Sequence, residues 1–207
     1  PKETSVVTKK DKDRLRNLAC QYTEYARGEP MVQRREKWRV HNRLQEKTFP
    51  FHIEDNGSYF GDLTPPLQCE DDECRALEGR LLHAVVAYEM IDDDRIIPDR
   101  FVIDWCTPLT GNCDELQFTR ADNGHGSSLG YMTNHPIKDI DADWGKLKKR
   151  TISLDREQTE RQAHVAREAF AGLLPVEIGR TSSLYSNGIT NKAVHLMGMQ
   201  ELYLQMA

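Results

Sequence analysis

Residues 73–104, ECRALEGRLLHAVVAYEMIDDDRIIPDRFVID, contain the clearest structural signal in this chain. Their first part places apolar side chains at the spacing of one broad helical face, namely Leu77, Leu81, Leu82, Val85, Val86, Tyr88 and Met90. Three aspartates at 92–94 then break the helix. The bulky and partly β-branched residues from Arg100 to Trp105 favour a strand. The stretch therefore predicts a helix over 73–91 that packs firmly on a sheet, followed by a strand.

The same two patterns recur on both sides of this stretch. Extended segments at 49–54 and 173–178 are the other strand candidates. Helical spacing or composition marks four further segments, which are 11–26, 31–47, 155–171 and 191 to the last residue. Strands that alternate with helices are typical of βα units and a parallel sheet. We therefore expect an α/β fold, with a helical N-terminal arm over 1–48 and the sheet-forming part over 49–207.

Composition limits the class of protein. The chain has 207 residues, 38% hydrophobic and 29% charged, with a formal net charge of −5. This balance is that of an ordinary globular protein, and the small acidic excess argues against a general nucleic-acid binder. No apolar run approaches the roughly 20 residues of a membrane-spanning helix, and the polar N-terminal segment differs from a secretion signal. We expect a cytoplasmic protein with no nucleic-acid or membrane partner.

The cysteines do not form a familiar metal motif. Their odd number, 5, fits reduced thiols in a cytosolic protein. Cys69 and Cys74 have four residues between them, and Cys106 and Cys113 have six. Neither pair has the two-residue spacing of a strong zinc knuckle. Small buried side chains are therefore the simpler interpretation.

Six segments follow one another in a distinctive order. They are LQCEDDECR (67–75), DRFVID (99–104), DADWGKLK (141–148), DREQTER (155–161), LPVEIG (174–179) and LMGMQELYL (196–204). This succession resembles the uroporphyrinogen-decarboxylase-like superfamily. Within it, the chain is most similar to the branch of anaerobe proteins near the corrinoid-dependent (cobalamin-dependent) methyltransferases. The resemblance covers residues 31–207.

The resemblance implies a (β/α)8 TIM barrel with its active site at the carboxyl ends of the strands. This chain would supply only the N-terminal part of that barrel, about three strands, since a typical barrel needs about 250 residues. Three parallel strands without closure leave a sheet edge that readily pairs with other chains. We therefore expect self-association, or a C-terminal half supplied separately, to cover that edge.

The resemblance also implies a reaction. Related methyltransferases move a methyl group from a small methylated substrate to a corrinoid, so that a corrinoid protein is an implied partner. They activate the substrate on zinc held by a His-x-Cys pair and a later cysteine. This sequence has no His-x-Cys pair. We therefore expect no metal site and no cofactor within this chain, with zinc and corrinoid bound by the complete protein.

Two alternatives to methyl transfer stay open. The first is decarboxylation of a tetrapyrrole, uroporphyrinogen, although the Arg-Gln-Ala-Gly-Arg run of true decarboxylases is missing from this sequence. The second is a non-enzymatic role, in which an inactive fragment or assembly subunit binds a partner through its open sheet edge.

Two residues are candidates for catalysis. Asp104 is the nearest match to the family's aspartate after its second strand, where a carboxylate accepts pyrrole N–H bonds or orients a methyl donor. The alternative is a strand-end aspartate that caps a turn. His52 lies two residues before Glu54 on the first strand candidate, so that both side chains are expected on one face, in the barrel lumen. Histidine is a common acid, base or ligand at such a place.

The other candidates are substrate contacts. Trp105 directly follows Asp104, and Glu54 accompanies His52. The polar stretch 107–135 is long enough to be a functional loop. Four further candidates lie in or beside loops, namely His125, His135, Arg180 and Tyr185. An arginine after a strand suits a carboxylate or a phosphate, because its guanidinium binds both through two hydrogen bonds. Solvated loop side chains are the alternative interpretation.

Overall fold

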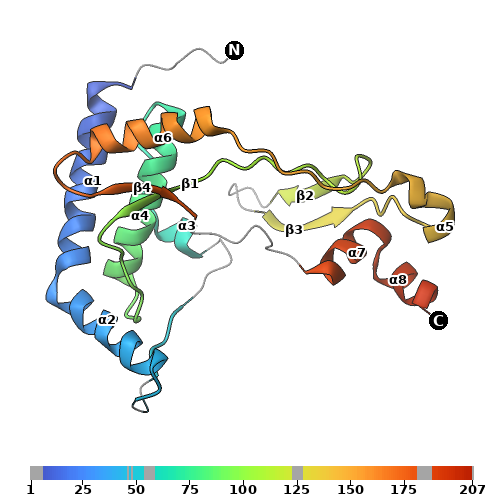
Figure 1. Ribbon diagram of the computed structural model, residues 1–207, viewed down its shortest axis with the longest axis horizontal. Helices are drawn as coiled ribbons and strands as arrows, with labels where there is room; N and C mark the ends of the chain where they lie inside the picture. The colour runs from blue at the N-terminus through green and yellow to red at the C-terminus, as the bar shows by residue number, and fades with distance from the viewer. Residues whose placement is uncertain are drawn as a thin grey trace. The chain divides into compact units, whose positions relative to one another are not determined.

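The computed structural model describes residues 7–45, 47, 49–53, 59–122, 128–180 and 188–206. These residues belong to two compact units, each made from two separate stretches of chain. The first unit spans residues up to 104 together with 156–180, and the second spans 105–155 together with the residues after 180. Figure 1 labels the helices and strands of both units.

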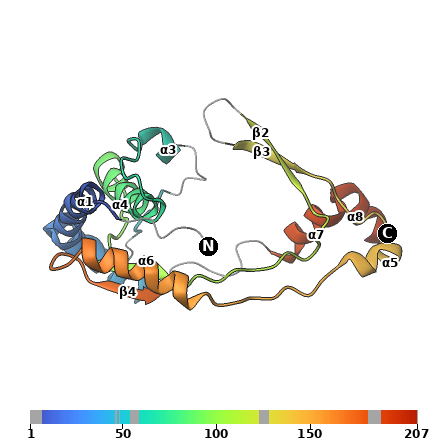
Figure 2. The same ribbon diagram turned by 90° about the horizontal axis from the view of Figure 1, so that it is seen from above.

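The first unit combines a helical layer with a short parallel sheet. The sheet pairs β1 (Phe101–Asp104) with β4 (Val176–Gly179), with Phe101 opposite Val176 and Asp104 opposite Gly179. Its helices are α1 (Lys9–Arg27), α2 (Glu29–Asn42), α3 (Tyr59–Leu63), α4 (Asp72–Met90) and α6 (Arg156–Ala169). Figures 1 and 2 show α1, α4 and α6 beside the β1–β4 pair. The unit therefore has two layers, helices on sheet.

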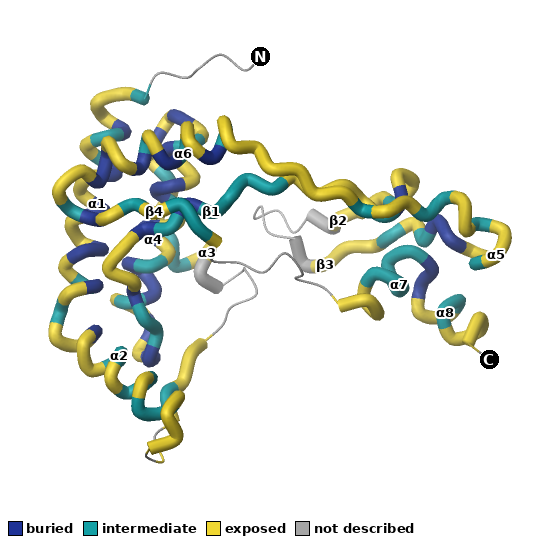
Figure 3. Tube along the Cα trace, viewed as in Figure 1, coloured by how far each residue is buried: buried dark blue, intermediate teal, exposed yellow. Residues whose placement is uncertain are grey.

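The core of the first unit lies where these helices meet the sheet, as the dark blue positions in Figure 3 show. Leu15 of α1, Leu81 of α4 and Phe170 after α6 are all 0–1% exposed. Burying each such side chain contributes about 1.5–3 kcal/mol to stability. The N-terminus of α4 is also capped, because the Asp71 side chain accepts a hydrogen bond from the Cys74 N–H.

The second unit contains an antiparallel hairpin and short helices. Strand β2 (Phe118–Asp122) pairs with β3 (Ser128–Thr133), with Arg120 opposite Tyr131. Isolated bridges, Cys106 with Asp155 and Leu109 with Ile152, link segments 106–112 and 148–155. Its helices are α5 (Ile140–Asp143), the 3-10 turn η1 (Trp144–Lys146), α7 (Ile189–Met197) and α8 (Met199–Met206). None of the helices that the structure describes could cross a membrane.

Most predicted elements are confirmed. The helix predicted over 73–91 is α4, the strand over 100–105 contains β1, and the strand over 173–178 overlaps β4. The helices predicted over 11–26, 31–47 and 155–171 are α1, α2 and α6, with α2 ending early at Asn42. The mixed helix-and-strand class holds, and β1 and β4 are parallel as expected.

Three predictions need correction. Residues 49–53 form no strand, because their backbone N–H groups bond to the carboxylates of Asp93 and Asp94 instead of a neighbouring strand. The polar stretch 107–135 contains the β2–β3 hairpin. The last helix breaks in two at Gly198, whose φ of 82° an α-helix cannot contain. The described residues form two separate two-stranded sheets without barrel closure.

Candidate functional site

The strand ends of the first unit bring together two of the predicted residues. Asp104 is the last residue of β1, and its partner in β4 is Gly179, so both strands end at the same level. Arg180 follows Gly179 directly and is exposed, whereas Asp104 is half-buried. Parallel sheets bind their ligands at the carboxyl ends of the strands. Asp104 and Arg180 therefore lie at the end of the sheet where a ligand is expected.

The two faces of the sheet differ in chemistry. Phe101 and Ile103 are buried under the helices, and alternation places Val102 and Asp104 on the opposite face. Gly179 packs closely on this face, because a Cβ at its position would come within 3.1 Å of Val102 Cγ1. The Asp104 carboxylate thus belongs to the face opposite the buried Phe101 and Ile103.

An arginine of α4 lies close to Asp104. The Arg80 guanidinium carbon is 4.3 Å from the centre of the Phe101 ring, and Arg80 Nη2 donates to Val102 O at 2.7 Å. Burial lowers the pKa of Arg80, and the negative charge of Asp104 works against that lowering. The Asp104 carboxylate and the Arg80 guanidinium therefore lie close enough to interact electrostatically.

His52 is held at another place in the first unit. Its Nδ1 lies 3.5 Å from Asp93 Oδ2. Phe51 N–H donates to Asp94 Oδ2 at 2.9 Å, and Ile53 N–H donates to Asp93 Oδ2 at 3.0 Å. Asp93 lies in the connection that enters β1 at its amino end. The structure thus ties His52 to Asp93 and gives it no lumen-facing strand position.

The second unit holds two more of the predicted residues. Trp105 is its first residue and is half-buried. His135 adopts a left-handed conformation with φ 47°, which is uncommon for a residue with a side chain. Its Nδ1 lies 2.9 Å from Thr133 Oγ1 and 3.1 Å from the carbonyl oxygen of His195. His135 therefore links the hairpin to α7. The predicted candidates Glu54, His125 and Tyr185 lie outside the described residues.

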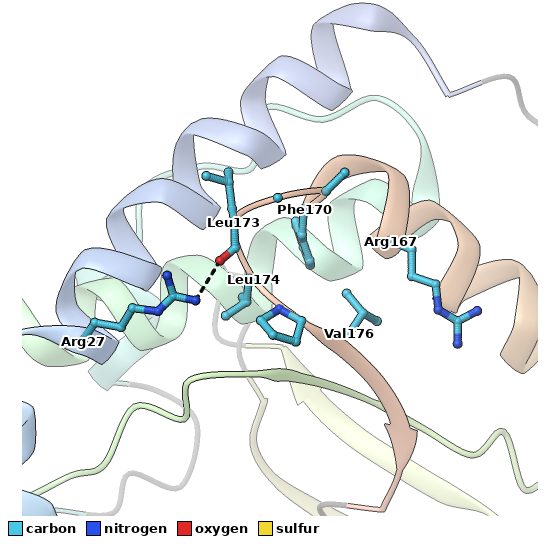
Figure 4. Close-up of a pocket in the computed structure, with 9 residues that line it drawn as sticks. Arg27, Arg167, Phe170, Leu173, Leu174 and Val176 are labelled. Carbon is cyan, nitrogen blue, oxygen red and sulfur yellow. Dashed lines mark hydrogen bonds between the residues drawn. The ribbon is translucent and has the colours of Figure 1, made fainter.

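A hollow of about 340 Å³ lies where the chain leaves α6 and enters β4, and Figure 4 shows the residues that line it. Phe170, Leu174 and Val176 lie between two arginines, Arg27 and Arg167. Arg27 Nη2 donates to Leu173 O at 3.1 Å, which helps to hold the α6–β4 connection against α1. This hollow adjoins the amino end of β4, the opposite end from Arg180. It is therefore separate from the strand-end site.

Cys69 and Cys74 are buried side chains of the first unit. Burial raises the pKa of Cys69 to about 12, and it also raises the pKa of Cys74. Both thiols are therefore protonated at neutral pH. Among the residues that the structure describes, no three His, Cys, Asp or Glu side chains are grouped to bind a metal.

Comparison with known proteins adds no further assignment: no protein-family model, no curated protein and no solved structure matches this chain. The resemblance to the uroporphyrinogen-decarboxylase-like superfamily therefore rests on the motifs of the chain itself.

Sequence patterns missed one feature of the second unit. A cavity there is lined by basic and aromatic side chains, including Arg120, Tyr131, Arg150, Lys192 and His195. No motif marks these residues, because they are spread from 111 to 196 and come from three different elements. The alternation of Phe118 and Arg120 is a local signal, but the pairing with α7 appears only in the fold.

Proposed function

We propose that the chain contributes the β1–β4 pair and its helices to a uroporphyrinogen-decarboxylase-like barrel enzyme that transfers a methyl group from a small methylated substrate to a corrinoid. The observation that supports this proposal is that two parallel strands end level with each other, with Asp104 last in β1 and Arg180 directly after Gly179 of β4. Phe101 and Ile103 of this sheet are buried in the core with the helices. That arrangement suits the start of a barrel, whose inner face takes substrate.

The proposal gives each residue a distinct task. The Arg180 guanidinium binds a carboxylate or phosphate of the substrate through paired hydrogen bonds. Asp104 accepts a hydrogen bond from the substrate and so orients the carbon that is transferred. Trp105, the first residue of the second unit, stays a candidate substrate contact. His52 stays a candidate for catalysis. Four further predicted residues stay candidate substrate contacts of the same enzyme, namely Glu54, His125, His135 and Tyr185.

We assign no step to a metal on this chain, because the described residues contain no fitting group of ligands. In this proposal a partner protein brings the corrinoid that accepts the methyl group. The part assigned to this chain is to bind the substrate and position it. Holding reacting atoms in line accelerates a reaction greatly even without further catalysis.

The test is a methyl-transfer assay with the complete gene product, a reduced corrinoid and a panel of methoxylated and methylthio compounds. Loss of the absorbance of the reduced corrinoid with at least one donor supports the proposal. Arg180→Gln should raise KM about tenfold for a carboxylated donor and leave kcat nearly unchanged. Carbon dioxide release from uroporphyrinogen without methyl transfer would instead favour decarboxylation. If the protein catalyses neither methyl transfer nor decarboxylation, the proposed enzymatic role is overturned.

A second candidate function is assembly with another chain through the sheet. Among the described residues, β1 and β4 each have one strand neighbour. Arg80 donates a hydrogen bond to Val102 O on β1, and this bond occupies an acceptor that an added strand would need. The outer edge of β4 is therefore the better place for an added strand. Light scattering of the purified chain tests this role. A concentration-dependent dimer or larger assembly supports it, and a stable monomer up to high concentration would contradict it.

A further inference from the structure

The hollow between α6 and β4 combines an apolar surface with two arginines. Its volume of about 340 Å³ is within the range of small-molecule sites. The described residues that line it are Arg27, Arg167 and the segment 170–176, FAGLLPV, which contains no polar side chain. Figure 4 shows the apolar side chains between the two arginines. The hollow therefore suits a molecule that has both an apolar part and a negative charge.

The core beneath the hollow fixes its apolar surface. Phe170 is 1% exposed and Leu174 is 4% exposed. The Phe170 ring meets the Phe101 ring edge to face, with their centres 5.2 Å apart. Leu174 N–H donates to Phe170 O at 3.2 Å, and Phe101 N–H donates to Pro175 O at 2.7 Å. A ligand thus meets a surface that has its shape before binding, which lowers the entropic cost of binding.

Two arginines of α1 hold the backbone of the same connection. Arg16 Nη1 donates to Ala171 O at 2.9 Å, and Arg27 Nη2 donates to Leu173 O at 3.1 Å. A guanidinium has five N–H groups. Within the part of the chain that the structure describes, the bond to Leu173 O is the one side-chain hydrogen bond of Arg27. Its other N–H groups can therefore bind a ligand while Leu173 O stays bonded.

The two arginines that line the hollow differ in their charge balance. Arg167 Nη1 lies 3.3 Å from Glu160 Oε2, so an acid already balances its charge. Arg27 has no ion pair with an acid among the described residues. A single cation of this kind matches a single negative charge, which favours a carboxylate over a doubly charged phosphate.

We propose that this hollow binds a carboxylate that carries a hydrocarbon chain, such as a medium-chain fatty acid. The carboxylate accepts hydrogen bonds from the Arg27 guanidinium, and the chain packs on Phe170, Leu174 and Val176. The hollow adjoins the amino end of β4, whereas Arg180 follows its carboxyl end. This site is therefore separate from the proposed substrate site and does not depend on methyl transfer.

Isothermal titration of the full chain with butyrate, hexanoate and octanoate, each below its critical micelle concentration, tests the proposal. Saturable 1:1 binding should tighten about threefold for each added methylene until the chain fills the hollow, and it should weaken as salt is added. The uncharged 1-octanol, with the same chain length as octanoate, should bind about tenfold more weakly. Absence of saturable octanoate binding, or equal affinities for octanoate and 1-octanol, would overturn the proposal.

Matched variants locate the site. Arg27→Gln should weaken octanoate binding about tenfold and leave 1-octanol binding nearly unchanged, because it removes only the charge. Arg16→Gln is the control, since Arg16 also holds the connection, at Ala171 O, but is not among the described lining residues; it should leave both affinities unchanged. Val176→Thr places a hydroxyl on the apolar surface and should weaken both ligands equally. Equal weakening of octanoate binding by the two glutamine variants would indicate nonspecific charge attraction and would contradict the proposal.

Discussion

A single buried carboxylate, Glu78, shows how residues far apart in sequence determine the packing of the first unit. Its side chain is fully buried and accepts hydrogen bonds from Arg14 Nε and from the N–H groups of Gln68 and Cys69, each at 2.8 Å. Burial alone would raise the pKa of Glu78, but the bonds from Cys69, Arg14 and Gln68 lower it below its ordinary value. Glu78 therefore joins α1, α4 and the segment before α4 as a charged group.

Replacing this carboxylate should destabilise the first unit. Glu78→Gln loses the ion pair with Arg14 and leaves buried N–H groups with weaker acceptors, at a cost of about 3 kcal/mol. Urea unfolding followed by circular dichroism at pH 7 measures this difference. The exposed pair of Glu70 and Lys10 provides the control, because Glu70→Gln should change stability by less than about 1 kcal/mol. Equal effects of the two variants would contradict this role.

The same residue predicts a pH dependence. The folded-state pKa of Glu78 lies below its ordinary value of 4.5. Its contribution is therefore complete above pH 4.5 and is lost as the pH falls through the folded-state pKa. The stability difference between the natural chain and Glu78→Gln should be largest near pH 7 and should shrink near pH 3. A difference that stays constant over this interval would show that the carboxylate charge is not involved.

Asp104 and Glu78 also show what sequence alone can tell about a residue. The place of Asp104 at a strand end follows from local pattern, because the apolar run of β1 stops there. The burial of Glu78 does not, because Arg14 lies 64 residues away and meets it only through the packing of α1 on α4. Local patterns locate a residue on an element, and tertiary contacts decide its environment.

At the level of elements, the helices were easier to predict from the sequence than the strands. The apolar residues of α4 repeat at helical spacing within one continuous segment, so the bounds of the helix follow from this periodicity. A strand needs a partner, but the backbone N–H groups of Phe51 and Ile53 donate to the carboxylates of Asp94 and Asp93 instead. The hairpin at β2 and β3 was missed for the opposite reason, since two polar segments pair with each other within a stretch that resembles a loop.

The N-terminus of α4 provides a prediction at this scale. Asp71 is 8% exposed, and its Oδ1 accepts a hydrogen bond from Cys74 N–H at 2.9 Å. Asp71→Ala removes this cap and should cost about 1 kcal/mol, whereas Asp71→Asn keeps a good cap and should cost less. Thermal unfolding of both variants gives the comparison. An alanine variant as stable as the asparagine variant would rule out a capping role.

The break between α7 and α8 gives another prediction. Gly198 has a φ of 82°, and an added Cβ would lie 3.3 Å from Cδ2 of His135. Gly198→Ala should therefore destabilise the second unit by about 2 kcal/mol through backbone strain and crowding of the imidazole. Hydrogen exchange of the α7 amides should become faster in this variant. Unchanged exchange in α7 would mean that the glycine is not required there.

Over the whole molecule, the chain passes between its two units three times, after Asp104, after Asp155 and after Arg180. Sequence patterns predicted a continuous series of βα units because strands and helices alternate, but such patterns do not show which segments leave the sheet. In this fold the crossover between β1 and β4 includes the ladder and the hairpin of the second unit. A parallel pair was therefore predictable, whereas its interruption was not.

The core distribution predicts where the molecule is most resistant to opening. Buried apolar residues of α1, α4, α6 and β1 form one cluster in the first unit. Backbone amides in well-packed elements exchange only when those elements unfold. Hydrogen exchange followed by mass spectrometry should find the slowest amides in α1 and α4 and faster exchange in α8, where no side chain is buried. Slowest exchange in α8 would contradict this distribution.

We propose that Asp104, at the end of the parallel pair, positions substrate in a methyl-transfer enzyme. Its most direct test is the single-turnover rate of methyl transfer by the complete gene product and by two variants with unchanged near-UV circular dichroism. Asp104→Asn should slow transfer about 100-fold. Glu177→Gln, at an exposed residue paired with Arg100, should keep the natural rate. A natural protein without transfer, or an Asp104→Asn variant as fast as the natural protein, would contradict the claim.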